Sequence, residues 1–254
     1  MKKDIAFSLS LQKEIQHKRL CLESEVEKSW SEVGIKTLLH RAGISKEKGF
    51  APSTLLFVLI LLPMIKESLT ALWSGKYFTR LLEARNDTYY RFLNCEYFNW
   101  RKLVTLIVSR MLARLDTAEF AQKVLIADDT LLHKTGKEME LVSYHFDHTT
   151  KRSHLGYQML QVGYHNGMDF YPVDVSFHTS KRRPNGNSKK MDRRSNGWKR
   201  RREAFEKKTN MLIHMLKAAG RQALMLGLSF STAGLPMTPS SHRSSISAMG
   251  SSAG

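Results

Sequence analysis

Cysteine is scarce in this chain, with only Cys21 and Cys95 among 254 residues. Two cysteines cannot build a disulfide framework or a multi-cysteine zinc ribbon, and they suit a reducing compartment. Long apolar runs are also missing: Leu55–Leu62 is closed by Pro63 and is far shorter than the roughly 20 residues of a membrane-spanning helix. The charged N-terminus has no apolar stretch of the kind that a secretory signal needs. We therefore expect a soluble, intracellular protein that does not contact the membrane.

Acidic residues are few, with 23 Asp and Glu against 40 Lys and Arg, so the formal net charge is +17. After Glu206 the sequence contains no Asp or Glu. An excess of positive charge indicates a polyanionic partner such as nucleic acid. Hydrophobic residues make up 42% of the chain, which is enough for a packed core and excludes wholesale disorder.

Residues 1 to about 118 have the pattern of a helical region. The apolar segment Leu55–Ile65 is typical of a buried helix. A later stripe recurs at every fourth position, which predicts one buried helix face. It consists of Leu103, Ile107, Met111 and Leu115.

Near residue 122 the pattern changes from helices to short strands. Val124–Ala127 is β-prone, and residues 141–147 alternate apolar and polar side chains. Tyr157–Tyr164 and Phe170–Phe177 predict a hairpin with its turn at Asn166-Gly167. A helix should follow from Arg201 to about Ala219. Its expected inward positions are Phe205, Leu212, Ile213 and Leu216.

This order predicts a mixed α/β fold in three parts. Residues 1–118 form a helical N-terminal region, and 119–222 form a partial core that begins with three antiparallel strands. Residues 223–254 are rich in Ser, Gly, Ala and Met with little periodicity, so we expect a disordered tail.

The segment 181–202 is the most basic part of the chain, with eleven Lys and Arg residues and a single acid, Asp192. Pro184, Gly186 and Gly197 predict an exposed loop. Such a segment binds nucleic-acid phosphates in a salt-sensitive and sequence-tolerant way. The alternatives are a localisation signal, an RNA-binding segment or a solvated charge run. The candidate DNA-binding residues are Lys181, Arg182, Arg183, Lys189, Lys190, Arg193, Arg194, Lys199, Arg200, Arg201 and Arg202.

Asp128 and Asp129 end the predicted strand at 124–127. A carboxylate at a strand end can share a divalent cation with phosphate oxygens. Neighbouring side chains of a strand point to opposite faces, so only one of the two can be a direct metal ligand. The alternative is a turn in which Asp129 or Thr130 accepts backbone N–H groups.

Two other metal sites can be considered. His145, His148 and His154 could suggest zinc, but no Cys lies near them, and the first two fall on opposite strand faces, so we do not expect zinc. A metal-dependent nuclease could instead pair Asp128 with Asp147 from a neighbouring strand. Asp147 and Asp174, the other strand-borne acids of this region, could equally be solvated edge residues.

The stretch 126–177 and the basic segment after it resemble insertion-sequence transposases of the DDE class. The resembling features are Asp128-Asp129-Thr130, Lys134-x-Gly136, Asp147-His148-Thr149, Gly156-Tyr157-Gln158 before a hairpin, and the basic segment. The resemblance covers roughly residues 50–220 and implies a ribonuclease H-like catalytic domain behind a helical region. It implies two Mg²⁺ ions held by three carboxylates, which activate water and then a freed 3′-OH for attack on DNA phosphodiesters.

In this family pattern the first carboxylate falls on Asp128, with Asp129 as the alternative. The implied partners are transposon ends and target DNA, in the bacterial cytoplasm and at the nucleoid when the protein is bound. The sequence leaves open whether the chain forms a homodimer through its helical half. The other class of function that fits is a non-catalytic nucleic-acid-binding protein that uses the basic segment.

The sequence departs from the family at the second and third carboxylates. The family commonly carries its second Asp in an Asp-Ser-Trp-Phe strand and a Glu farther on, and neither occurs here. Codons can be chosen for Ser229–Ser241 that, read two nucleotides later, give Phe-Phe-Asp-Ser-Trp-Phe-Ala-Tyr-Asp-Pro-Ile-Ile. We therefore predict a frameshift between about Ala218 and Ser229 and loss of catalysis. Strands lost in this way would leave an unpaired sheet edge, so we expect poor soluble expression.

Overall fold

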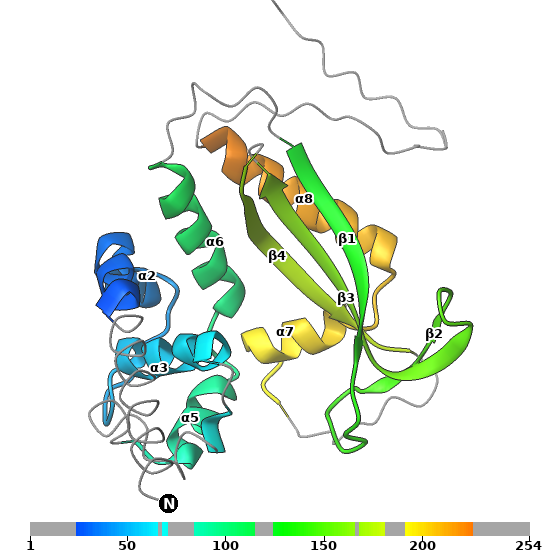
Figure 1. Ribbon diagram of the computed structural model, residues 1–254, viewed down its shortest axis with the longest axis horizontal. Coiled ribbons are helices and arrows are strands. Elements are labelled where there is room, and N and C mark those ends of the chain that lie inside the picture. The colour runs from blue at the N-terminus through cyan, green and yellow to red at the C-terminus, as the bar shows by residue number, and fades with distance from the viewer. Residues whose placement is uncertain are drawn as a thin grey trace, which may run out of the picture.

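The computed structural model describes residues 24–65, 68–70, 84–114, 124–165, 168–180 and 191–225. Helices come first along the chain and a sheet with two further helices follows (Figure 1). The first group is α2 (Ile35–Arg41), α3 (Pro52–Ile65), α5 (Asn86–Leu93) and α6 (Trp100–Leu112), and residues 24–33 are also helical. The second group is β1 (Val124–His133), β2 (Ser143–Asp147), β3 (Arg152–His165), β4 (Phe170–His178), α7 (Asn196–Glu203) and α8 (Lys208–Met225). This order confirms the predicted mixed α/β class, with the helical region before the sheet.

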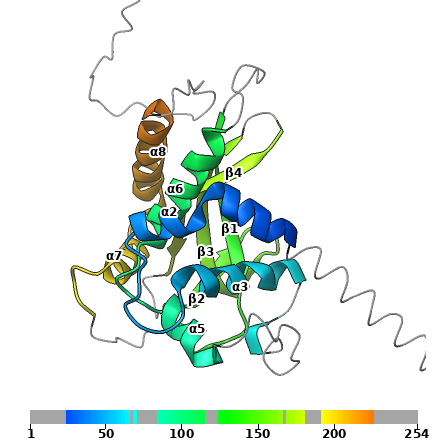
Figure 2. The same ribbon diagram turned by 90° about the vertical axis from the view of Figure 1, so that its left-hand side faces the viewer.

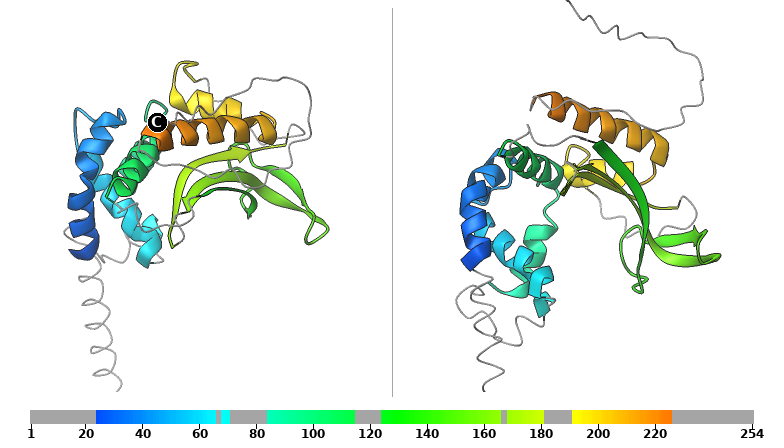
Figure 3. Two further views of the ribbon diagram at one scale, coloured as in Figure 1. Left: turned by 90° about the horizontal axis from the view of Figure 1, so that it is seen from above. Right: turned by 45° about the horizontal axis from the view of Figure 1, so that its top comes forward.

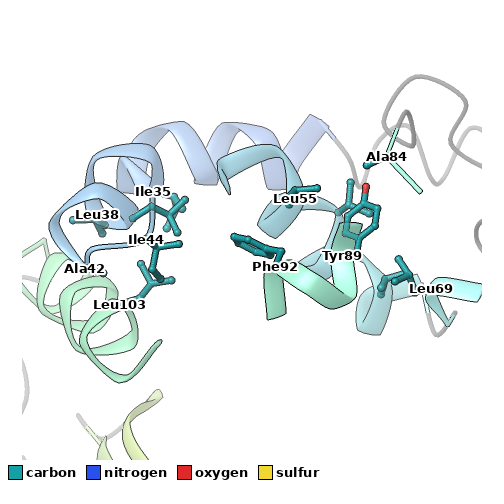
Figure 4. Packing of buried hydrophobic residues seen from close by; sticks show 13 residues of the cluster. Ile35, Leu38, Ala42, Ile44, Leu55, Leu69, Ala84, Tyr89, Phe92 and Leu103 are labelled. Atoms are coloured by element: carbon teal, nitrogen blue, oxygen red, sulfur yellow. The ribbon is translucent and has the colours of Figure 1, made fainter. Parts of the chain in front are cut away.

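One apolar cluster holds the helical half together (Figure 4). Leu55 of α3, Tyr89 and Phe92 of α5 and Leu103 of α6 are all buried in it. The Phe92 ring packs edge to face against Trp100, with ring centroids 5.3 Å apart, a geometry that aromatic pairs favour. The prediction that the segment 55–65 is a buried helix is therefore confirmed.

Helix α6 joins the helical half to the sheet (Figure 2). Leu103 belongs to the helical cluster, whereas Val108 and Leu112 pack in a second cluster with β3, β4 and α8. The predicted stripe was wrong at Met111, which is exposed, and Leu115 lies outside the described residues. Because α6 faces two different cores, its buried positions do not follow a single stripe.

Strand β3 lies at the centre of an antiparallel sheet. One edge of β3 pairs with β1, and this pairing runs from Val124 opposite His165 to His133 opposite Gly156. Its other edge pairs with β4 over residues 158–165 and with β2 over residues 152–156. The predicted hairpin is confirmed as β3–β4, and its turn at 166–167 lies outside the described residues. Among the described residues the sheet has four strands, one more than the predicted three, and β2 pairs with the part of β3 that extends beyond β4.

Helix α8 lies along one face of this sheet (Figure 3). Met211 and Met215 pack there against Leu160 and Val162 of β3. The single helix predicted from Arg201 is in fact two helices, since residues 204–207 interrupt it. Of the expected inward positions, Phe205 lies in the interruption and is exposed, and Ile213 of α8 is also exposed. Leu212 and Leu216 are partly buried and pack against the cluster.

Candidate functional site

Asp128 and Asp129 lie in the middle of β1, so the prediction that they end a strand was wrong. β1 stays paired with β3 as far as His133↔Gly156. The backbone ladder can continue through polar residues because the face carrying Asp128 is open to solvent. The alternative of a turn at Asp129 or Thr130 is excluded by the same pairing.

The two aspartates point to opposite faces and have different partners. Asp129 lies on the α8 face and forms an ion pair with Lys208 at the start of that helix. Asp128 lies on the other face, opposite Gln161 of β3. Its Oδ2 accepts a hydrogen bond from Thr130 Oγ1 at 2.8 Å, and the residue is exposed. The described partner of Asp128 is thus a neutral hydroxyl, whereas that of Asp129 is a lysine. The negative charge of Asp128 is therefore available to bind a cation.

The Asp128 face of the sheet borders two adjoining cavities, which we call the sheet groove. The larger, of about 720 Å³, is lined by Gln161 and Met159 of β3 and by Arg200 and Arg201 of α7. The smaller, of about 480 Å³, shares Arg200 and Arg201 and reaches Tyr157. The cross-strand neighbour of Asp128 and the basic helix therefore line the same hollow.

The basic segment is helical in its second half, so the predicted exposed loop was wrong for residues 196–203. Ser195 Oγ accepts the Trp198 N–H at 3.1 Å and caps the first turn of α7. Gly197 donates its N–H to Glu96 O at 2.8 Å, and a Cβ there would lie 3.1 Å from the Glu96 side chain. This glycine therefore permits a close contact between α7 and the helical half instead of making a flexible loop. Residues 181–190, with five of the candidate DNA-binding residues, lie outside the described part.

The basic residues that the structure does describe fall into two groups. Arg200 donates to Glu203 at 3.1 Å and to Val175 O at 2.6 Å, and burial lowers the pKa of its guanidinium. Arg201 forms an ion pair with Glu140. The exposed group presents its charge to solvent, with the Arg202 guanidinium 5.6 Å from the centre of the Trp198 ring. It consists of Arg193, Arg194, Lys199 and Arg202.

Arg101 of α6 is a residue that sequence reasoning missed. It donates to Asp174 of β4 at 2.7 Å and to both oxygens of Glu203 in α7 at 2.9 and 3.0 Å. Asp174 is therefore no solvated edge residue, and burial raises its pKa although Arg101 and Arg200 act in the opposite direction. No local pattern marks Arg101, because its partners lie 73 and 102 residues away in the sequence.

The hypothesis of a nuclease site formed by Asp128 and Asp147 was wrong. Asp147 accepts the Thr149 N–H at 2.8 Å and the Thr150 hydroxyl at 2.9 Å, and these bonds lower its pKa. It pairs with Arg152, nine residues along β3 from Gln161, which is a separation of about 30 Å at the rise of a strand. Two carboxylates so far apart cannot share an ion.

Within the described ranges, no three His, Cys, Asp or Glu side chains gather closely enough to hold a metal ion. The donors around Asp128 are one carboxylate, the Thr130 hydroxyl and, across the strand, the Gln161 amide. Two Mg²⁺ ions need several carboxylates or other oxygen ligands. The described residues therefore do not fit a two-metal centre.

A family model described as DDE superfamily endonuclease matches residues 78–228, more than half of the chain. The chain belongs to this family. No curated protein and no solved structure matches it. The match spans the whole sheet with α7 and α8, so this DDE endonuclease domain includes Asp128 and the basic helix, and the resemblance to a transposase-like nuclease is confirmed. In the part of the chain that the structure describes, no helix has the length and apolarity to cross a bilayer.

Proposed function

We propose that this DDE endonuclease is a transposase of the insertion-sequence type that binds DNA and whose own catalytic set is incomplete. The observation that carries the proposal is an exposed Asp128 on β1, on the sheet face that the groove and the basic helix α7 share. In an intact relative the first carboxylate would help to hold Mg²⁺, which activates the attacking oxygen. Asp128 fits that role better than Asp129, which Lys208 neutralises.

DNA binding would use the exposed basic residues around α7. Four exposed basic residues can each contact a phosphate without giving up a carboxylate partner that holds the fold. Among the described residues, only Arg194 of this group has an ion pair, and that is with the neighbouring Asp192. The group is Arg193, Arg194, Lys199 and Arg202. Each phosphate contact releases about one counterion, so affinity should fall steeply as salt is raised. Such binding would place the protein on the bacterial nucleoid.

The incomplete catalytic set follows from the sequence after Glu206, where no carboxylate occurs. The match to the family model stops at residue 228, at the end of the interval in which we predict the frameshift. A shifted frame that encodes Asp-Ser-Trp-Phe would supply the second carboxylate on the strand that follows α8.

The test compares the chain with a version whose reading frame is restored from its coding DNA. The present chain should shift labelled DNA in a salt-dependent manner and should not nick a supercoiled plasmid with Mg²⁺. The restored protein should nick it, Asp128→Asn should abolish nicking, and Asp129→Asn should serve as the matched control.

Three results would contradict parts of this proposal. Failure of the chain to bind any DNA would remove the transposase function. Cleavage by the chain itself would show that its catalytic set is complete. Coding DNA without an Asp-Ser-Trp-Phe-like strand in a shifted frame would exclude the frameshift, and the chain would then be a non-catalytic nucleic-acid-binding protein.

A further inference from the structure

Strand β2 exposes two aromatic rings that contribute nothing to either core. Tyr144 is 61% exposed and Phe146 is 51% exposed. The ring of His148 stands edge to face against Phe146, with centroids 5.1 Å apart. Tyr144 and Phe146 are two residues apart on one strand, so their rings form a small apolar patch on one face, and such a patch can serve as a binding surface.

The hairpin that carries these rings extends beyond the rest of the sheet. The pairing of β1 with β3 ends at Gly156 and that of β4 ends at Gln158, so β3 residues 152–155 pair with β2 alone. Figures 1 and 3 show β2 on the side of the molecule away from the helical half. Asp147 closes the turn through its bonds to Thr149 and Thr150. The hairpin is thus a defined arm whose tip is held by its own hydrogen bonds.

The exposed rings lie on the same face of the sheet as Asp128. Tyr144 pairs with Leu155 and Phe146 with Ser153, and both β3 partners are an even number of residues from Gln161, the partner of Asp128. Side chains two apart on a strand share a face, and no bulge interrupts β3 between these positions. The distance from Gln161 to Ser153 is eight residues, about 26 Å along the strand.

The sheet groove lies on the part of this face between Asp128 and the rings, from Gln161 to Tyr157. Tyr157 lies between Asp128 and the rings, and the exposed Lys134 lines the same hollow. At the tip of the arm Lys151 is exposed, while the carboxylate of Asp147 accepts hydrogen bonds within the turn. The surface therefore combines two exposed rings with the exposed side chains of Lys134 and Lys151.

We propose that the β2–β3 hairpin is a contact site for single-stranded DNA, in which Tyr144 and Phe146 stack on unpaired bases of a strand that passes Asp128. Exposed rings beside basic residues are the combination by which proteins hold single strands, since every base offers a flat apolar face. A duplex keeps its bases stacked on one another and offers these rings much less. The inference rests on the proposed DNA-binding function and extends it to a second surface, distant from α7.

The test measures binding of the full chain to a fluorescently labelled oligothymidine and to a duplex by fluorescence anisotropy over a range of salt. The variant Tyr144→Ala/Phe146→Ala removes both rings, and Tyr144→Leu/Phe146→Leu removes them while it keeps apolar side chains in the strand. Tyr90→Ala/Ile213→Ala is the matched control, because both residues are exposed to a similar degree but belong to α5 and α8.

Both ring variants should bind the oligothymidine roughly tenfold more weakly or worse, as expected for the loss of base stacking. Duplex affinity and the salt dependence should change little, because the rings release no counterions. The control should bind both DNAs as the unchanged chain does.

Other outcomes would overturn the inference in ways that can be told apart. If both ring variants bind the oligothymidine and the duplex as the unchanged chain does, the hairpin is not a contact site for single-stranded DNA. The proposed DNA-binding function would then still hold. A change of oligomeric state in light scattering without a change in DNA affinity would make the rings a self-association surface. Absence of DNA binding by every version would remove the proposed function and this inference together.

Discussion

Replacing Arg101 by Met should destabilise the protein more than any other single removal of a charge in the described residues. Arg101 connects three elements, since it lies in α6 and binds Asp174 of β4 and Glu203 of α7. Met keeps most of the side-chain volume but removes every hydrogen bond. The substitution takes the main cation from Asp174 and Glu203. The side chains of these two residues are only 9% and 21% exposed, respectively.

The magnitude follows from the burial of these groups. Removing one partner of a buried ion pair costs about 3–5 kcal/mol, because the other charge stays desolvated. Arg101 itself is 28% exposed, and Arg200 still neutralises Glu203, so we expect the lower end, about 3 kcal/mol. For a chain of this size that corresponds to a melting temperature lower by about 6–12 °C. Arg91→Met, which breaks the exposed Arg91–Asp87 pair, should change stability little.

The pH dependence distinguishes a lost charge pair from lost packing. Burial raises the pKa of Asp174, and Arg101 opposes this rise. A carboxyl with a raised folded-state pKa contributes stability below its unfolded pKa, and this contribution is lost as the pH rises through the folded pKa. Without Arg101 the pKa should rise further, so the penalty of Arg101→Met should be full at about pH 7 and smaller at about pH 5.

Thermal unfolding followed by circular dichroism measures this penalty. The double variant Arg101→Met/Asp174→Asn should be more stable than Arg101→Met alone, because the amide carries no buried charge. A penalty independent of pH, or a double variant less stable than the single one, would refute the electrostatic reasoning and leave packing as the cause.

Three further predictions concern the sheet and the basic helix. The double variant Lys199→Gln/Arg202→Gln should weaken duplex binding and reduce its salt dependence, and its melting temperature should not change. Arg200→Gln should instead lower the melting temperature, because Arg200 donates hydrogen bonds to Glu203 and to Val175 O of β4. Gly156→Ala should destabilise by about 2–3 kcal/mol in urea unfolding, since its Cβ would lie 2.1 Å from Leu132 O. Asp129→Ala should change stability by less than about 1 kcal/mol, because both Asp129 and Lys208 are over one-third exposed; a larger loss would show that this pair positions α8.

The sequence predicts the strands and the buried helix of this protein because each has a local cause. Alternation over 141–147 and the two apolar runs around residue 166 mark β2, β3 and β4. Leu55–Ile65 is almost entirely apolar, which predicts a buried helix without knowledge of its partners. These features need no knowledge of contacts distant in the sequence.

The elements that were predicted wrongly depend on such distant contacts. The extent of β1 beyond Ala127 is set by its ladder with β3. The first turn of α7 has a distant partner too, since Glu96 O accepts the N–H of Gly197. Charge counting grouped eleven basic residues as one surface, but Glu140 and Glu203 bind Arg201 and Arg200. A pattern of residue types shows where charge is concentrated, and only the fold shows which charges are neutralised.

The two outer edges of the sheet differ in whether other elements cover them, and this difference is related to the carboxylates that the metal site lacks. Arg101 and Arg200 both donate to Val175 O, which covers the outer edge of β4 with α6 and α7. The outer edge of β1, in contrast, pairs with no strand among the described residues. A strand added there would lie directly beside Asp128 and could bring a second carboxylate to it, since neighbouring strands are only about 4.8 Å apart. The proposed shift of reading frame between about Ala218 and Ser229 would remove that strand and its carboxylate together, so one event would account for both the open edge and the missing ligand.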